Sequence, residues 1–212
     1  LEIDLEENLE NMFVSSTDLS NSDKTDGFLK KATVLKKGDF SGAFLQAGVA
    51  ELTMATIANG IALHGGIIPV VATFFVFSDY MKPAIRLSCI QELPVKFVWT
   101  HDAFRVGEDG PTHQPVEQEA QIRLLEKLKN HSHEQSFVAL RPADSMETNV
   151  AWKMAMENNK TPTGLILSRQ GITDIPTKSG DRYKEALGAE KGGYLVQEVT
   201  DADVVLIANG SE

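Results

Sequence analysis

The sequence predicts an α/β fold in which a parallel sheet is covered by helices on both faces. Two observations carry this prediction. Short runs that are almost wholly apolar, such as residues 67–75 and 95–99, are typical of strands buried on both faces. These runs alternate along the chain with longer stretches of helix-forming composition, such as residues 78–91. That alternation favours parallel strands joined by helical crossovers.

Turn signals and periodicity set the order of the expected elements. The expected strands cover residues 12–16, 67–75, 95–99, 137–140 and 163–167. The expected helices cover 48–60, 78–91, 117–129 and a stretch to about Asn158 that Asp144 or Ser145 caps. We expect the helix over 48–60 to be buried on most of its surface. The acidic residues 1–9 suggest a helix end, and 24–42 a loop with at most a short strand at 32–35. Two further strands are expected at 193–198 and 204–208.

Length and composition limit the classes of function. With 212 residues, 42% hydrophobic and 24% charged, the chain has the composition of one ordinary soluble domain with an appendage. A net charge of −10, with no basic cluster beyond residues 30–31 and 36–37, argues against a nucleic-acid partner. Apolar runs stay well short of the roughly 20 residues that cross a bilayer, and the single Cys89 excludes an internal disulfide. We therefore expect a cytoplasmic protein without a membrane partner.

The polar loop over residues 100–118, THDAFRVGEDGPTHQPVEQ, is the most informative segment. It follows an expected buried strand, and ligands in open α/β sheets bind outside the carboxyl ends of the strands. His101, Asp109 and His113 supply titratable groups along a path that glycines and prolines restrict. A plain surface connection with solvated charges is the alternative.

Three other places hold candidate site residues. Glu51 is the only charge before His64 in an otherwise apolar helix; it suits the helix macrodipole, or acid–base catalysis if it is buried. An aromatic cluster follows the strand at 67–75, and core packing also explains such a cluster. Arg169 follows the strand at 163–167, where either a surface arginine or a phosphate-binding guanidinium fits.

The strings THD, GEDGPTHQPVEQ and LSRQ resemble the pyrimidine-binding domain of transketolases, which are thiamine-diphosphate enzymes. Related thiamine enzymes share DGPTH-like pieces without the full set. The resemblance covers roughly residues 11–170, and the last 21 residues resemble the start of the third transketolase domain. It implies a pyrimidine-binding domain over 1–176, a linker over 177–191 and a truncated start of the C-terminal domain over 192–212.

The resemblance also implies which residues meet the cofactor. GVAELTM is similar to the family's GVREFGM, whose glutamate hydrogen-bonds N1′ of the aminopyrimidine, so Glu51 would promote formation of the reactive ylid. The pattern TFxxFxxY is similar to the family's ring cluster around the aminopyrimidine, which assigns Phe74, Phe77 and Tyr80 to the cofactor. STDLSNS resembles a SADL-type segment whose aspartate lies near the cofactor, here Asp18.

The remaining matches concern the substrate. By resemblance, Ser22, His101 and Arg169 meet the substrate phosphate, while Asp109 and His113 meet the sugar hydroxyls and the reacting carbonyl region. Glu51 and His113 are therefore the catalytic candidates.

The implied reaction moves a two-carbon ketol unit from a ketose phosphate to an aldose phosphate in the pentose phosphate pathway. The family implies a homodimer with the active site at the subunit interface. No GDG…N motif is present, so Mg²⁺ or Ca²⁺ and the diphosphate are expected on an upstream domain, and this piece alone is expected to be inactive. His131 and His133 lack the further ligands of a metal site. The alternatives are a relative such as dihydroxyacetone synthase, or a non-catalytic binding module of the thiamine family.

Overall fold

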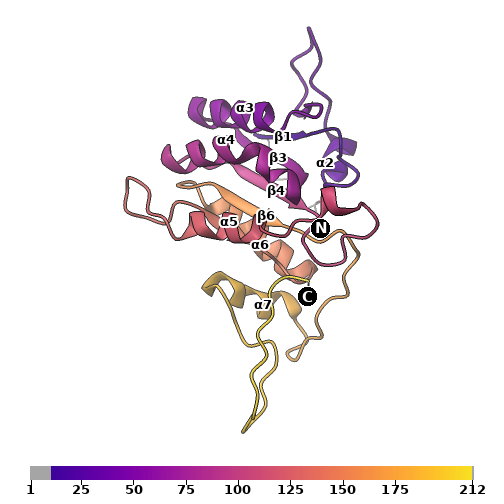
Figure 1. Ribbon diagram of the computed structural model, residues 1–212, viewed down its shortest axis with the longest axis vertical. Helices are drawn as coiled ribbons and strands as arrows, with labels where there is room; N and C mark the ends of the chain where they lie inside the picture. Colours follow the sequence, from indigo (N-terminus) through magenta and orange to yellow (C-terminus); the bar gives the residue numbers. More distant parts are fainter. Residues whose placement is uncertain (1–10, 212) are drawn as a thin grey trace.

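A computed structural model describes residues 11–211, and the expected helix end at residues 1–9 lies outside them. Six strands form one sheet with the order β2-β1-β3-β4-β6-β5, and every neighbouring pair is parallel. The strands are β1 (Met12–Ser16), β2 (Phe44–Gln46), β3 (Ile68–Phe74), β4 (Lys96–Thr100), β5 (Val138–Leu140) and β6 (Thr163–Ile166). The helices are α2 (Asp26–Lys31), α3 (Glu51–His64), α4 (Ser78–Ile90), α5 (Gln118–Glu126), α6 (Ser145–Glu157) and α7 (Arg182–Ala186). The predicted fold class is confirmed (Figure 1).

Alternate residues of the central strands supply two hydrophobic cores, one on each face of the sheet. On one face, Val71, Phe97 and Ile166 pack with side chains of α3, α4 and α5. On the other face, Val98 and Leu165 pack with side chains of α2 and α6. Successive side chains of a strand point to opposite faces, so strands that are apolar throughout need a helical layer on each side.

Aromatic rings fill the first core at its centre. The ring of Trp99 stacks on Phe97 with centroids 5.5 Å apart and on Phe137 at 6.2 Å. A Cβ atom at Gly164 would lie 2.5 Å from the Trp99 ring and 2.9 Å from Phe137. This position therefore requires glycine, because only a residue without a side chain lets the two rings close over the sheet.

Lys96, which interrupts the apolar run of β4, is fully buried. Its Nζ atom donates a hydrogen bond to the carbonyl oxygen of Asn158 at 2.6 Å. Burial lowers the pKa of Lys96 to about 8, because the charged ammonium loses its hydration. The strand predicted at residues 95–99 agrees with β4 to within one residue, although the charge of Lys96 argues against burial.

The segment from residue 24 to residue 46 holds more structure than the sequence predicts. A short helix, α2, and the three-residue strand β2 occur there, whereas the expected strand at 32–35 forms only an isolated bridge from Val34 to Phe44. Both elements are too short to produce a periodic pattern. Phe44 forms part of the second core, and tertiary packing therefore decides this segment.

The expectation for α3 is wrong in one respect. Its sheet-facing residues are buried, but Leu52, Ile57 and Leu63 are each exposed by more than 40%. A helix on the outer layer of a sheet buries one stripe, and no other element of residues 11–211 covers the opposite side.

The C-terminal predictions are corrected. The expected linker at 177–191 contains α7 and the 3₁₀ helix η3 (Leu187–Lys191). Neither 193–198 nor 204–208 forms a strand, because a strand needs a hydrogen-bonded neighbour and none pairs with them among the described residues. The side chains of residues 204–207 are instead 70–94% exposed. Across residues 11–211 we find no helix with the length and apolar character that spanning a bilayer requires.

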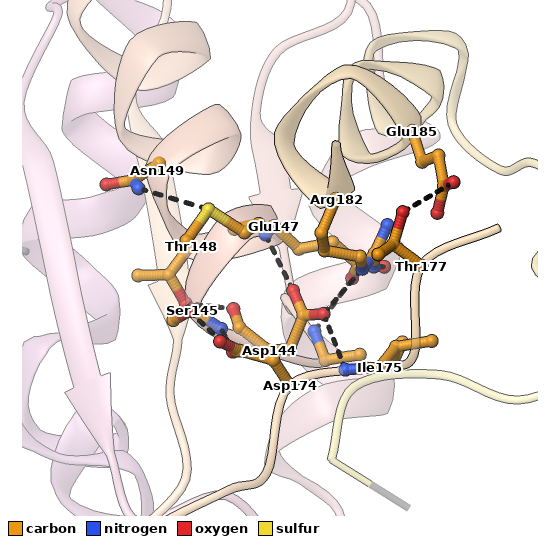
Figure 2. Close-up of polar contacts among 12 residues, drawn as sticks. Asp144, Ser145, Glu147, Thr148, Asn149, Asp174, Ile175, Thr177, Arg182 and Glu185 are labelled. Carbon is orange, nitrogen blue, oxygen red and sulfur yellow. Dashed lines mark hydrogen bonds and ion pairs between the residues drawn. The ribbon is translucent and has the colours of Figure 1, made fainter. Parts of the chain in front are cut away.

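A buried ion-pair network attaches α7 to the start of α6 (Figure 2). The Arg182 Nε atom donates to Asp144 Oδ2 at 2.7 Å, and an Nη2 hydrogen bond of 3.0 Å reaches Glu147 Oε1. Asp144 also caps α6, as predicted, by accepting from the Glu147 amide at 2.8 Å, and it accepts from the Ile175 amide at 3.1 Å. Tyr194 donates to Glu147, which brings the chain after η3 to the same network.

We predict that Arg182→Ala lowers the free energy of unfolding by about 3–5 kcal/mol, because it leaves the buried Asp144 carboxylate and the partly buried Glu147 carboxylate without their cation. Lys184→Ala is the matched control, since its ion pair with Asp181 is solvent-exposed and should contribute little to stability. Urea unfolding monitored by circular dichroism measures both variants. Equal small losses in the two variants would contradict a stabilising role for the buried network.

Candidate active site

The candidate site lies where the strand order reverses. The chain runs from β1 to β2 on one side of β1, whereas β3 and β4 lie on its other side. The pairing of Ser16 with Ala72 and of Phe74 with Thr100 brings the carboxyl ends of these three strands to one edge. In open α/β sheets, ligands bind at this kind of switch point.

Glu51 begins α3 at this edge, and its side chain is buried, with the residue only 5% exposed. Its carboxylate accepts a hydrogen bond of 3.4 Å from Thr73 Oγ1 of β3. Thr73 accepts in turn from Thr17 Oγ1, just after β1, at 3.0 Å. The carboxylate is therefore held between α3 and two strands while much of its acceptor capacity stays unused. The sequence did not indicate Thr17 or Thr73 as site residues. The hydroxyl group of Thr73 inside the apolar run of β3 was the feature that could have indicated it.

The predicted rings gather at the same edge of the sheet. Phe74 ends β3, and the 3₁₀ helix η1 (Phe75–Phe77) follows it, turning the Phe75 side chain into the core. Phe74 and Phe77 stack with a centroid distance of 5.8 Å and an interplanar angle of 9°. Tyr80 lies 6.0 Å from Phe77 and is 62% exposed. The edge thus holds two stacked rings and an exposed phenol.

Both loop histidines pack against these rings. The His101 ring lies 4.2 Å from the ring centroid of Phe74. His113, at the end of the 3₁₀ helix η2 (Pro111–His113), makes edge contacts with Phe77 at 5.3 Å and with Phe74 at 6.0 Å. The loop over 100–118 therefore folds back over the aromatic cluster, so it is more than a solvated surface connection.

His101 is buried and surrounded by charge. Its Nε2 atom lies 3.8 Å from Asp109 Oδ2, and its Nδ1 atom has no hydrogen-bond partner within residues 11–211. Burial lowers the pKa of His101 to about 4; Asp109 opposes this, while the positive charges of Arg169 and Lys24 and the neighbouring His113 add to it. The imidazole is therefore neutral near pH 7.

Arg169 reaches the same place from the end of β6. Its guanidinium lies against Gly107, where an added Cβ would be 3.0 Å from Arg169 Nη1. Gly107 also has a φ of +92°, so the loop needs glycine for its backbone and for the space that Arg169 occupies. The sequence alone left open whether Arg169 is a plain surface residue; the structure brings it to the histidine.

Asp18 and Ser22 lie in the turn after β1. The Asp18 carboxylate accepts from the Gly48 amide at 3.4 Å, just before α3. The Ser22 carbonyl oxygen accepts from Thr100 Oγ1 at 3.0 Å, which fixes the turn against the residue before His101. All ten predicted site residues thus belong to turns and termini at one edge of the sheet.

The sequence did not predict the buried ion pair between Arg141 and Asp102, the residue that follows His101. Asp102 accepts from Arg141 Nη2 at 3.2 Å and from Ser211 Oγ at 2.9 Å, and its amide donates to the Leu167 carbonyl at 3.0 Å. Arg141 also binds Glu119 of α5 at 3.1 Å. These contacts hold the backbone next to His101. The signal was available, because the string RPAD places an arginine directly after a strand.

The functional groups at this edge of the sheet fit an aminopyrimidine ring. A ring of that kind presents nitrogen atoms at its edge and a flat π surface, and the edge offers a buried carboxylate acceptor beside two stacked phenylalanine rings. Residues 11–211 hold no group of three or more His, Cys, Asp or Glu side chains that could bind a metal ion.

Comparison with known proteins identifies the family. Residues 3–173 match the family described as transketolase, pyrimidine binding domain. A transketolase of Bacillus subtilis is 46% identical over 200 residues, which are 93% of this chain and 28% of the relative. The solved transketolase of Pichia stipitis in complex with sedoheptulose 7-phosphate is 35% identical, with a TM-score of 0.75 over 91% of this chain and 27% of that one. The chain belongs to the transketolase family, within the pyrimidine-binding domain.

The chain spans only about 28% of the length of the curated relatives that it matches. A solved structure described as a split gene transketolase, inactive beta4 tetramer, is 28% identical with a TM-score of 0.59, over 81% of this chain and 49% of that one.

We predict that acid destabilises the fold partly through His101. The unfolded imidazole takes up a proton near its ordinary pKa of 6.5, whereas the folded one does so only near pH 4, so the unfolded state binds more protons between these values. The free energy of unfolding should therefore fall as pH drops from about 6.5 to about 4. His101→Gln should show a smaller fall over this range, and His131→Gln, on an exposed turn, should behave like the parent. Urea unfolding at a series of pH values tests this.

Proposed function

We propose that this chain supplies the pyrimidine-binding half of a transketolase active site. Together with a diphosphate-binding part, it transfers a two-carbon ketol unit from a ketose phosphate to an aldose phosphate. The observation that carries the proposal is the buried Glu51 carboxylate and the stacked rings of Phe74 and Phe77 at the same sheet edge, where the strand order reverses. Residues 1–176 form the pyrimidine-binding domain, 177–191 connect it onward, and 192–212 begin the C-terminal domain.

Thiamine diphosphate, when bound, supplies the carbanion chemistry of the reaction. Glu51 would accept a hydrogen bond from the aminopyrimidine and hold the proton that activates the ring. Phe74, Phe77 and Tyr80 would pack on its faces and exclude water, and Asp18 would line the approach from the turn after β1. Mg²⁺ or Ca²⁺ and the diphosphate would be bound outside this chain, which alone would be inactive and bind the cofactor weakly.

The substrate would lie over the loop of residues 100–118. Asp109 and His113 would contact the sugar hydroxyls, and His113 would assist at the reacting carbonyl. His101, Arg169 and Ser22 would receive the phosphate. The support is their convergence on the carboxyl ends of β4 and β6 beside the proposed cofactor rings.

The exposed side of α3 supports assembly with a second subunit. Val49, two residues before Glu51, is 90% exposed, and Leu52 is exposed directly after it. Apolar side chains around a buried catalytic carboxylate fit a site that a partner subunit completes. We infer a homodimer with Glu51 and the Phe74/Phe77 pair near its interface, formed in the cytoplasm.

An assay of the complete enzyme, reconstituted with its diphosphate-binding part, decides the proposal. Transfer from xylulose 5-phosphate to ribose 5-phosphate is the expected activity. Transfer to formaldehyde with no transfer to ribose 5-phosphate would favour a dihydroxyacetone synthase, and no reaction with cofactor bound would favour a non-catalytic module.

In that enzyme, Glu51→Gln should slow deuterium exchange at the cofactor's thiazolium carbon by about 10²–10⁴-fold, the usual effect of losing one proton-transfer group. The fold should persist, because glutamine keeps the size of the side chain. Glu157→Gln, at the far end of α6, is the matched control. Exchange as fast as in the parent enzyme would remove Glu51 from the mechanism.

Arg169→Ala should lower kcat/KM for phosphorylated substrates by roughly ten- to over a hundredfold, because a charge-assisted hydrogen bond contributes about 1.5–3 kcal/mol. Unphosphorylated donors should be little affected, since they have no such contact to lose. Arg86→Ala, an exposed arginine on α4, controls for the lost charge. Equal losses for both substrate classes would identify Arg169 as a structural residue.

A further inference from the structure

The ion pair of Asp102 and Arg141 is buried next to the candidate site. The two side chains are only 2% and 4% exposed, and Arg141 Nη2 lies 3.2 Å from Asp102 Oδ2. Arg141 comes directly after β5 and also binds Glu119 of α5 at 3.1 Å. Loss of either partner of a buried pair is costly, because the remaining charge cannot regain its hydration. The pair is therefore a fixed point to which neighbouring segments can attach.

The backbone is fixed on both sides of His101. On the side before it, Thr100 ends β4, and Thr100 Oγ1 donates to the Ser22 carbonyl oxygen at 3.0 Å. On the side after it, the Asp102 amide donates to the Leu167 carbonyl oxygen at 3.0 Å, while the Asp102 carboxylate holds the buried arginine. The His101 Nδ1 atom has no hydrogen-bond partner among the described residues. The place of the imidazole therefore depends strongly on the segment that carries it.

Ser211 bridges the segments that carry the two phosphate-binding candidates. Its hydroxyl donates to Asp102 Oδ2 at 2.9 Å, and Asp102 directly follows His101. The same hydroxyl accepts from Gln170 Nε2 at 3.4 Å, and Gln170 directly follows Arg169. One side chain thus joins the loop after β4 to the segment after β6.

The backbone before Ser211 packs on the same ion pair. Gly210 is buried, and an added Cβ atom would lie 2.7 Å from Cγ of Arg141. The side chains of residues 204–207, by contrast, are 70–94% exposed. The chain after residue 207 therefore docks on the domain at the pair of Asp102 and Arg141.

We propose that Asp102, Arg141 and Ser211 are positioning residues for phosphate recognition. They hold His101 and Arg169 at the separation that one phosphate group requires, without contacting the substrate themselves. This inference rests on the proposed function. Because Ser211 belongs to the segment after residue 192, its contact makes phosphate recognition depend on how that segment docks.

The first experiment measures the placement of His101 on this chain without relying on activity. The ring centroids of His101 and Phe74 are 4.2 Å apart, so a nuclear Overhauser effect between the two rings reports their approach. Ser211→Ala removes only the bridging hydroxyl, and it should weaken this effect and shift the His101 ring resonances. Ser132→Ala is the matched control, because its hydroxyl donates to the Glu92 carboxylate at the same 2.9 Å, before β4. An unchanged His101 signal in Ser211→Ala would overturn the positioning role.

Two further variants separate the hydroxyl and the ion pair. Ser211→Thr keeps the hydroxyl and should retain the His101 signals of the parent. Asp102→Asn keeps the size of the side chain but removes the charge that pairs with Arg141, so it should change the His101 signals more than Ser211→Ala does. A folded Asp102→Asn variant with the parent signals would contradict the proposal. If that variant does not fold, the two Ser211 variants decide.

Inorganic phosphate then serves as the probe on the same chain. It should shift the His101 resonances of the parent, and Ser211→Ala should need a higher phosphate concentration for the same shift. Ser211→Thr and Ser132→Ala should respond like the parent. An equal response of the parent and Ser211→Ala would overturn the role in phosphate recognition.

The last experiment uses the complete enzyme. Ser211→Ala should raise KM for phosphorylated substrates by about threefold to tenfold with little change in kcat, which is less than the roughly hundredfold loss that a misplacement of about 1 Å can cause. Unphosphorylated donors should keep their KM, and Ser211→Thr should recover the parent value. Equal KM increases for both substrate classes would assign Ser211 a structural role only. A parent enzyme that lacks ketol transfer, but whose His101 signals respond to phosphate and to Ser211→Ala, would overturn the proposed function alone.

Discussion

The parallel pairing of β1 with both β2 and β3 is the constraint on which the site depends. Because β1 lies between strands to which the chain travels in opposite directions, the loops after β1 and β3 separate at the edge of the sheet. The start of α3 enters that opening and carries Glu51 into contact with Thr73. With antiparallel pairing, the ends of neighbouring strands would alternate between the two edges, and these residues would not meet.

Electrostatics at this edge differs from that of the chain as a whole. The protein is acidic, but the positive charges of Arg169 and Lys24 act on a neutral, buried His101. Buried cations elsewhere are tied to carboxylates, as Arg141 is to Asp102 and Arg182 to Asp144. A buried charge needs an oppositely charged partner within the protein. A cation at the solvent-exposed edge of the sheet stays hydrated until an anionic ligand binds.

Segments differ in how well sequence patterns predicted them. Long, strongly apolar strands such as β3 and β4 are predicted to within one or two residues, because burial on both faces leaves a continuous apolar run. The short elements α2, β2 and α7 were missed, since their formation depends on distant contacts such as Phe44 in the second core and Arg182 on Asp144. The strands expected near the C-terminal end are apolar enough, but within residues 11–211 they have no neighbour to complete a ladder.

The sequence by itself determined the α/β class, the family and the residue types of the site, because apolar runs and short motifs such as GEDGPTHQ are local properties of the chain. It could not determine the contacts between Glu51 and Thr73, between His101 and Phe74, or between Arg169 and Gly107. Each joins segments more than 20 residues apart. Only the tertiary structure decides such contacts, because the order and register of the parallel strands bring those segments to one edge.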